Sequence, residues 1–336
     1  MRKYSLLVIE DKSYYDHLLD FDSELFHVEY SGLRHYKSDL RKFDLIISFN
    51  YLSDLGNYII VKAKIQNVRT LLLSDGIIEW SNMFSNSKFT KKNLKLFHPI
   101  IHDYFFCVGS NESSYFNSLG QKTYNYIPNR MKTKETKSTN AKKIDFLLTT
   151  ANTPYHNLSE KRILIKILKN ILQDMKKNEY SFAFRIYDRS LIEELNILEH
   201  QNFIKNDFNT TFNQFKCLIT TPSSIIISAI KQKKPVAQII YRDTPLFLQS
   251  GWMITSLNVD STIKSMLNHE VERMDFQLWQ LNSYINESGD VSKIISRDKE
   301  KTNVSEHFNT RLENLIQSKY NINFESGRLT TQHKFG

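Results

Sequence analysis

Short runs of consecutive apolar residues alternate with longer amphipathic stretches along the whole chain. Continuous apolar runs are typical of strands buried on both faces of a parallel sheet, and apolar residues at helical spacing are typical of the helices that cover it. In the first half, the predicted strands occupy residues 3–10, 26–32, 43–50, 69–76, 104–109 and 122–128. Helices are predicted between them at residues 57–67 and 110–120. This alternation predicts an α/β unit of the Rossmann-like type.

The same alternation begins again after a polar stretch at residues 129–143. In the second half, the predicted strands occupy residues 144–151, 180–188, 216–222 and 235–241. The predicted helices occupy residues 158–178, 191–200 and 223–234, and from about residue 261 the pattern is helical to the end. The expected organisation is therefore a first Rossmann-like domain at 1–130, a linker at 131–143, a second Rossmann-like domain at 144–260, and a helical C-terminal segment at 261–336.

The composition is that of a packed globular protein with a basic surface. Of the 336 residues, 40% are hydrophobic and 24% are charged, and the formal net charge is +9. This balance argues against disorder and favours an anionic partner, without choosing among a nucleotide, a phosphorylated acceptor, nucleic acid and an acidic membrane face. Cys107 and Cys217 lie in apolar runs, which predicts buried structural thiols rather than a disulfide framework or a metal cluster.

The pattern of hydrophobic runs also bears on where the protein resides. No apolar run approaches the length of a membrane span, and the run near the N-terminus is too short for a signal peptide. We therefore expect a cytoplasmic protein, with a peripheral place on the inner face of the cytoplasmic membrane left open by its basic charge.

The loop after the predicted strand at 69–76 holds the most polar cluster of the first half. Asp75 and Gly76 end the apolar run, and Glu79, Trp80 and Asn82 follow within one helical turn of one another. Loops at the carboxyl ends of parallel strands hold the ligands in open α/β sheets, which favours a site here. A capped turn with Asp75 as the helix N-cap is the alternative. Trp80 is expected to serve packing.

Three loops of the second half follow predicted strands and must share one edge of a parallel sheet. Ser223 and Ser224 start a predicted helix, where hydroxyls and free backbone N–H groups suit a phosphate, although a serine N-cap explains one of them equally well. The other two loops supply Thr150, Asn152 and Thr153 from one strand end and Arg185, Tyr187 and Asp188 from another. Together, these loops predict a binding site for a nucleoside monophosphate.

These residues resemble the signature of the sialyltransferase-like GT-B glycosyltransferases. That family has an acidic residue before glycine in the first of two Rossmann-like domains, and a serine pair at a helix start in the second. Asp75-Gly76 and Ser223-Ser224 match this signature in kind and order. The family's His-Pro in the second domain is replaced here by Tyr187-Asp188. The resemblance implies a GT-B fold, with two parallel sheets facing a cleft.

The longer strings SDGIIEWSN and HPIIHDYFFCVGS and the loop TTANTPY look closer to the β-Kdo transferases of bacterial capsule and O-antigen biosynthesis. The resemblance covers roughly residues 69–250. It implies transfer of Kdo, or of sialic acid, from a CMP-activated donor to a lipid-linked or oligosaccharide acceptor. Position by position, it implies that Asp75 is the nucleophile of a retaining reaction, although an inverting reaction with Asp75 as the base is equally compatible with a carboxylate there.

The remaining residues receive roles in the same hypothesis. His98 is a candidate acid/base or a ligand of the sugar carboxylate, while a merely structural histidine is the alternative. Gly76, Glu79 and Asn82 are candidate sugar or acceptor contacts. No cofactor or metal is expected beyond the donor substrate, because no His/Cys cluster has zinc spacing. The motif Asp20-Phe-Asp22 is interpreted as a solvated turn.

Two other classes of function remain open at this stage. One is a different GT-B transferase, such as a CDP-glycerol glycerophosphotransferase, which also has a serine pair before a helix. The other is a non-enzymatic basic module for nucleotides or nucleic acid. Nucleic acid is not expected as a partner, because the 17 tyrosines and 22 phenylalanines fall mostly in strand-like runs and do not form a platform interleaved with arginine.

Overall fold

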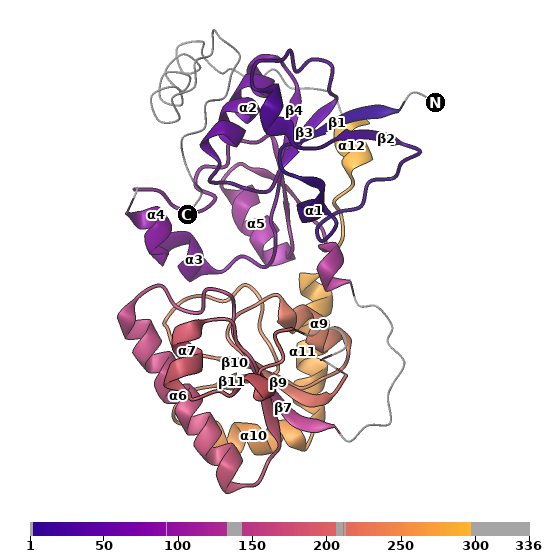
Figure 1. Cartoon of the computed structure of the whole chain (residues 1–336). Helices are drawn as coiled ribbons and strands as arrows, with labels where there is room; N and C mark the ends of the chain where they lie inside the picture. Colours follow the sequence, from indigo (N-terminus) through magenta and orange to yellow (C-terminus); the bar gives the residue numbers. More distant parts are fainter. Residues whose placement is uncertain (1–2, 92, 133–142, 206–210, 212, 297–336) are drawn as a thin grey trace.

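The computed structural model describes residues 3–91, 93–132, 143–205, 211 and 213–296. Two separate parallel sheets organise these residues, one above the other in Figure 1. We call the layers around the N-terminal sheet the first domain and those around the other sheet the second domain. The GT-B architecture predicted from the sequence is confirmed.

The first sheet has six strands in the order β2-β1-β3-β4-β5-β6, and every neighbouring pair is parallel. Its strands are β1 (Tyr4–Val8), β2 (Phe26–Glu29), β3 (Leu45–Ser48), β4 (Arg69–Leu73), β5 (Tyr104–Cys107) and β6 (Lys122–Asn125). Leu6 and Val8 of β1 pack into one core cluster, and Leu7 between them packs into another. Both faces of the sheet are thus covered at its centre, which explains why β1, β3, β4 and β5 are largely apolar, whereas the edge strands β2 and β6 are more polar.

The second sheet has five parallel strands in the order β11-β10-β9-β7-β8. Its strands are β7 (Ile144–Thr149), β8 (Phe182–Arg185), β9 (Phe215–Thr220), β10 (Val236–Ile239) and β11 (Trp252–Ile254). Phe146 and Leu148 of β7 face one core cluster, and Leu147 faces the other. This sheet is therefore also covered on both faces.

Helices cover both sheets. They are α1 (Lys12–Tyr15), α2 (Asp54–Ile65), α3 (Trp80–Ser85), α4 (Ser87–Thr90), α5 (Ser110–Ser118), α6 (Leu158–Lys177), α7 (Arg189–Glu194), α9 (Ile225–Lys231), α10 (Val259–Leu267), α11 (Val271–Tyr284) and α12 (Val291–Ser296). The described residues also form three 3₁₀ turns, η1 (Gly32–His35), η2 (Asn129–Met131) and η3 (Glu199–Gln201). Helix α6, the longest in the described part of the chain, buries one apolar stripe against β7, as its helical periodicity predicts.

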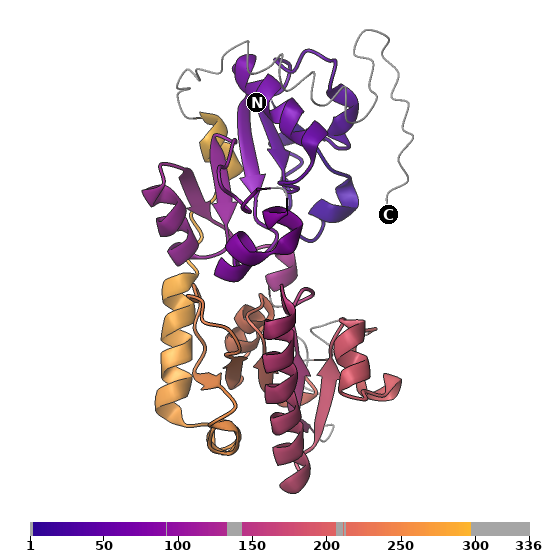
Figure 2. The ribbon, with the colours of Figure 1, turned by 90° about the vertical axis from the view of Figure 1, so that its left-hand side faces the viewer.

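The C-terminal helices are divided between the two domains. Helix α10 packs on the second sheet, and α11 contacts α9 there while also reaching α5 of the first domain. The chain then returns to the first domain, where Val291, Ile294 and Ile295 of α12 pack with Leu6 and Val8. Figure 2 shows this segment running along one side of the molecule from the second domain to the first. The predicted helices are present as far as Ser296, and residues 297–336 lie outside the described residues.

Several predicted boundaries are wrong in detail. The helix predicted from Ser223 begins at Ile225, and the helix predicted over 191–200 is the shorter α7 followed by η3. Strand β11 was not predicted. Met131, which we assigned to the linker, is 2% exposed and packs in a core cluster that joins the two domains. The rest of the predicted linker falls almost entirely on residues 133–142, outside the described residues.

Candidate functional site

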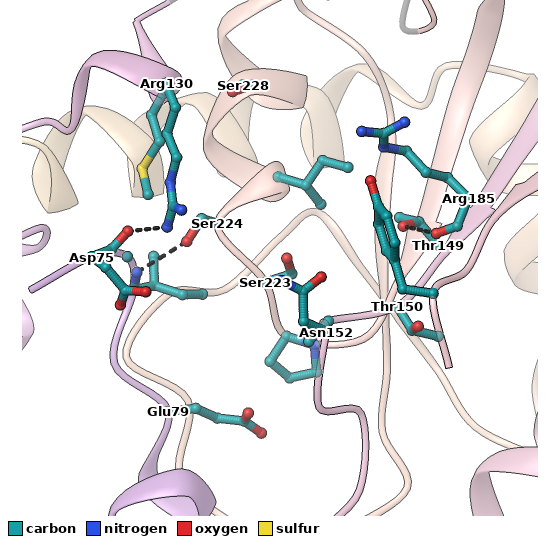
Figure 3. A pocket seen from close by; sticks show the side chains of 17 residues that line it. Asp75, Glu79, Arg130, Thr149, Thr150, Asn152, Arg185, Ser223, Ser224 and Ser228 are labelled. Atoms are coloured by element: carbon teal, nitrogen blue, oxygen red, sulfur yellow. Dashed lines mark hydrogen bonds between the residues drawn. The ribbon is translucent and has the colours of Figure 1, made fainter. Parts of the chain in front are cut away.

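A cavity of about 340 Å³ lies between the carboxyl ends of strands from both sheets. Figure 3 shows it from close by. The first domain lines it with residues that follow β4 and β6, and the second domain with residues at the ends of β7, β8 and β9. Its lining residues are Asp75, Gly76, Ile77, Glu79, Arg130, Met131, Thr149, Thr150, Ala151, Asn152, Arg185, Tyr187, Pro222, Ser223, Ser224, Ile225 and Ser228. Nine of the thirteen predicted site residues are among them.

Asp75 is placed at the cavity by a strand that cannot shift easily. Strand β4 is buried along Thr70–Leu73 and pairs with β3 and β5. Ser74 is also held in place, because its backbone N–H donates to the carbonyl of Phe106 and its own carbonyl accepts a hydrogen bond from the buried Tyr126 hydroxyl. The Asp75 side chain that follows is exposed to the cavity. A carboxylate on so rigid a support is positioned for chemistry on a ligand held opposite.

Gly76 allows the loops of the two domains to touch. A Cβ atom at this position would lie 2.6 Å from the Ser224 hydroxyl and 3.0 Å from a guanidinium nitrogen of Arg130. Because Gly76 has no side chain, Ser224 Oγ can instead accept a hydrogen bond of 3.1 Å from the backbone N–H of Ile77. Ser224 is therefore not a side-chain N-cap of α9, and it serves as a contact across the cavity.

The second-domain wall presents hydroxyl and amide groups. The loop after β7 is fixed by a 2.8 Å hydrogen bond from the Ala151 N–H to Thr221 Oγ1. Thr150, in the same loop, is 4% exposed, and its hydroxyl has no partner among the described residues. Asn152 is exposed at the mouth of the cavity. A buried hydroxyl without a partner is costly, so Thr150 marks a place where a ligand would supply the missing hydrogen bond.

Arg185 and Tyr187 form the far end of this wall. The guanidinium of Arg185 lies 5.5 Å from the ring centroid of Tyr187 and donates a 2.6 Å hydrogen bond to the carbonyl of Phe203. The Arg185 carbonyl accepts a 2.7 Å hydrogen bond from Thr149 Oγ1. Tyr187 is 44% exposed. A cation beside an exposed aromatic ring is well suited to a planar base or an anionic group of a ligand.

Glu79 joins the domains by a buried ion pair. Its carboxylate lies 2.7 Å from Arg242 of the second domain, and Arg242 also lies 3.4 Å from Glu160. The side chains of all three are at most 13% exposed. Burial raises the pKa of Glu79, and the neighbouring arginine opposes that shift. Glu79 thus has a structural partner besides its place on the cavity wall.

His98, a predicted catalytic residue, lies outside the lining of the cavity that Asp75 lines. His98 lines a different cavity of about 450 Å³, together with Phe97 and Phe116. Its Nδ1 is 2.8 Å from the carbonyl of Leu96, and its Nε2 is 3.0 Å from the hydroxyl of Tyr115. Both ring nitrogens have partners and aromatic rings surround the imidazole, which favours the alternative of a structural histidine.

Three more predicted residues lie outside the cavity lining. Asn82 lies on α3, and its Oδ1 accepts a 2.8 Å hydrogen bond from the side-chain amide of Asn86. Asp188 caps α7, accepting from the Leu191 N–H at 2.9 Å and from the hydroxyl of Tyr155. Thr153 is exposed beyond the cavity. Asn82 and Asp188 thus have local structural roles that the sequence did not distinguish from ligand contacts.

Sequence reasoning missed Arg130. The sequence places it at the boundary of a polar linker, but it belongs to η2, which begins four residues after the end of β6, and its side chain lines the cavity (Figure 3). Its guanidinium donates a hydrogen bond to the backbone carbonyl of Asp75. The signal available in the sequence was its position after a predicted strand, since that is the same rule that located Asp75.

Three further predictions concern the cysteines, metal sites and membrane-spanning helices. Cys107 and Cys217 are buried free thiols as predicted, and burial raises the pKa of both. Within the described ranges, no group of three or more His, Cys, Asp or Glu side chains could hold a metal ion. No helix in the described part of the chain is long and apolar enough to cross a membrane.

The fold can be compared with proteins of known structure. No protein-family model matches the chain, and no curated protein does so either. A Listeria monocytogenes protein described as a UDP-N-acetylglucosamine 2-epimerase is similar with a TM-score of 0.59 and 12% identity, over 90% of this chain and 100% of that one. MnaA of S. aureus, solved with UDP, has a TM-score of 0.52 and 12% identity over 100% of both chains.

A third similar structure is the UDP-GlcNAc 2-epimerase of Neisseria meningitidis bound to UDP-GlcNAc. Its TM-score is 0.52 with 10% identity, over 83% of this chain and 94% of that one. Identities this low show the shared fold alone. In this chain, an exposed carboxylate on one domain faces hydroxyl, amide and guanidinium groups on the other across the cavity.

Proposed function

We propose that the protein is a glycosyltransferase that transfers a sugar acid, Kdo or sialic acid, from a CMP-activated donor to a bacterial surface glycan. One observation carries the proposal: Asp75 and the Ser223-Ser224 loop line the same cavity from opposite domains, and Gly76 lets the two loops touch. This is the pairing of motifs on which the resemblance to the β-Kdo transferases rests. The fold, shared with proteins solved with UDP or UDP-GlcNAc, is compatible with a nucleotide-sugar donor.

The polar wall of the second domain would hold the nucleotide. Thr150, Asn152 and Ser223 present hydroxyl and amide groups, and Arg185 with Tyr187 closes one end. Hydroxyl donors near the phosphate would stabilise the negative charge that develops as CMP leaves. The unsatisfied hydroxyl of Thr150 would gain a partner when the donor binds. The sugar would then extend toward Asp75 on the facing wall.

In the retaining route, the Asp75 carboxylate attacks the anomeric carbon. The new bond joins an Asp75 oxygen to that carbon, while the bond from the carbon to the phosphate oxygen breaks and CMP leaves with its electron pair. The acceptor hydroxyl then displaces Asp75, which regains its charge, and the hydroxyl proton passes to solvent. In the inverting route, Asp75 instead takes the proton of the acceptor hydroxyl as it attacks.

The first experiment is a thermal-shift screen with CMP, CDP-glycerol, UDP-GlcNAc and single-stranded DNA. Stabilisation by CMP, and more strongly by a CMP-sugar acid, is the expected result, because a ligand that binds only the folded state raises its stability. Stabilisation by CDP-glycerol or UDP-GlcNAc in its place would favour a glycerophosphotransferase or an epimerase. Stabilisation by DNA alone would favour a non-enzymatic binding module.

The second experiment tests Asp75 directly. Intact-protein mass spectrometry of the wild type with CMP-Kdo should show an increase by one sugar residue if the retaining route operates, and Asp75→Ala should show none. Turnover by Asp75→Ala at the wild-type rate would remove Asp75 from the mechanism. The acceptor is proposed to be lipid-linked or an oligosaccharide, and the net charge of +9 would favour peripheral association with an anionic membrane surface.

A further inference from the structure

Two cations lie on the wall of the cavity among the described residues, and they stand at opposite ends of it. Figure 3 shows Arg130 beside Asp75 on the first-domain side and Arg185 near Thr149 on the second-domain side. An arginine at each end indicates a ligand with two separate anionic or strongly polar groups. One of these groups is the phosphate of the proposed donor. A donor with a neutral sugar would not supply the second anionic group.

Arg130 differs from the nearby Arg242 in its partners. Arg242 is buried and paired with two carboxylates, Glu79 and Glu160. Arg130 is exposed to the cavity, and in the described part of the chain its guanidinium makes one hydrogen bond, to the carbonyl oxygen of Asp75. No carboxylate of that part forms an ion pair with it. Its remaining N–H groups are thus available to an anion in the cavity.

The position of Arg130 relative to Asp75 favours a particular anion. A nucleophile attacks the anomeric carbon from the face opposite the leaving group, so the phosphate lies away from Asp75. Arg130 is held at the backbone of Asp75 itself, on the same wall. In an ulosonic acid, the carboxylate is bonded directly to the anomeric carbon and lies beside the attack path. A guanidinium anchored at the nucleophile can reach that carboxylate more easily than it can reach the phosphate.

We propose that Arg130 binds the carboxylate of the donor sugar and thereby selects acidic sugars; this inference rests on the proposed function. The planar guanidinium fork matches a carboxylate with two parallel hydrogen bonds, which a lysine cannot reproduce. Arg130 also lies five residues after the end of β6, where the chain leaves the first domain. Arg130, which would select the sugar, therefore lines the cavity between the two domains.

The test measures the affinity of the full-length protein for CMP and for a CMP-sugar acid by titration calorimetry. Arg130→Gln should weaken binding of the CMP-sugar acid by roughly 10- to 100-fold, the range expected for a lost hydrogen bond to a charged group. Binding of CMP alone should change by less than about threefold. Lys132→Gln, which removes an exposed positive charge two residues away, is the matched control and should leave both affinities unchanged.

Two further measurements keep the test decisive if Arg130→Gln folds poorly. Arg130→Lys keeps the charge and should retain only part of the preference for the sugar acid. For the wild type, the methyl ester of the CMP-sugar acid should bind roughly 10- to 100-fold more weakly than the acid itself, because the ester carries no charge for Arg130 to bind. An equal loss for CMP and CMP-sugar acid would mean that Arg130 binds the phosphate, and an unchanged preference would remove it from the site; either result overturns the inference alone. Failure of the wild type to bind CMP would overturn the proposed function as well.

Discussion

Glu112 on α5 is a carboxyl group buried at the contact between the two domains. It is 0% exposed, and its Oε1 accepts hydrogen bonds from the hydroxyl of Tyr284 on α11 and, at 3.3 Å, from the backbone N–H of Ile78. Its Oε2 has no partner among the described residues. Burial raises the pKa of Glu112 from 4.5 to about 7, although both hydrogen bonds oppose the shift.

This raised pKa makes stability depend on pH with a definite sign. Between pH 4.5 and about 7, the folded protein binds a proton at Glu112 that the unfolded chain has released. The stabilising contribution is therefore complete below the unfolded pKa and is lost as pH rises through the folded pKa. A shift from 4.5 to about 7 corresponds to about 3 kcal/mol over the full window, as an order of magnitude.

Glu112→Gln removes the titration while keeping the size of the side chain and its acceptor for Tyr284. We expect the free energy of unfolding of the wild type to fall, relative to the variant, by about 2 to 3 kcal/mol between roughly pH 5 and pH 8. The assay is urea unfolding of both proteins at the two pH values, followed by tryptophan fluorescence and circular dichroism, whose transitions should coincide.

The comparison between pH values cancels any constant effect of the substitution, including an unsatisfied amide N–H. Glu194→Gln, an exposed glutamate of α7, is the control and should track the wild type at both pH values. If Glu112→Gln and the wild type show parallel pH profiles, Glu112 is ionised at neutral pH in the folded protein and our account of its burial is wrong.

Three other substitutions test the contacts around the cavity. Gly76→Ala should lower nucleotide affinity about 10-fold or more, because its Cβ would meet Ser224 Oγ at 2.6 Å, and adding Ser224→Ala should restore part of the loss in the same titration. Arg242→Met should reduce the free energy of unfolding by about 3–5 kcal/mol in urea, since it leaves two carboxylates buried without their cation; an effect below about 1 kcal/mol would contradict a buried ion pair. Thr150→Val should leave stability nearly unchanged but weaken binding of the proposed donor several-fold, because its hydroxyl has no partner until a ligand arrives; unchanged donor affinity would exclude that contact.

The strands were predictable because most of them are short apolar runs buried on both faces. Segments such as 43–50 and 144–151 contain β3 and β7, since a continuous apolar run between polar turns has few other places in a folded chain. Strand β11 was missed because it has only three residues, Trp252–Ile254, and follows a glycine in a segment without a clear period. Its pairing with β10 comes from tertiary contact rather than from local pattern.

Residues of the candidate site could be predicted from the sequence only by their position at or after the end of a strand. The rule that ligands bind beyond the carboxyl ends of strands located Asp75, Thr150, Arg185 and Ser223, which come from both sheets. The same rule could not tell a ligand contact from a cap, so Asp188 was included although it caps α7. The sequence also could not show that His98 lines a separate cavity, with a partner at each of its ring nitrogens.

The return of the C-terminal segment joins the two domains a second time. The chain leaves the first domain after β6 and comes back at Ser288 and Gly289, whose backbone N–H groups both donate to the carbonyl of Asn125, the last residue of β6. The two chain segments that pass between the domains therefore meet at the end of β6, and a hinge for any opening of the cavity would lie at this strand end. The hydrogen bond from the Ile77 N–H to Ser224 Oγ and the Glu79–Arg242 ion pair are among the contacts that would have to break for the cavity to open.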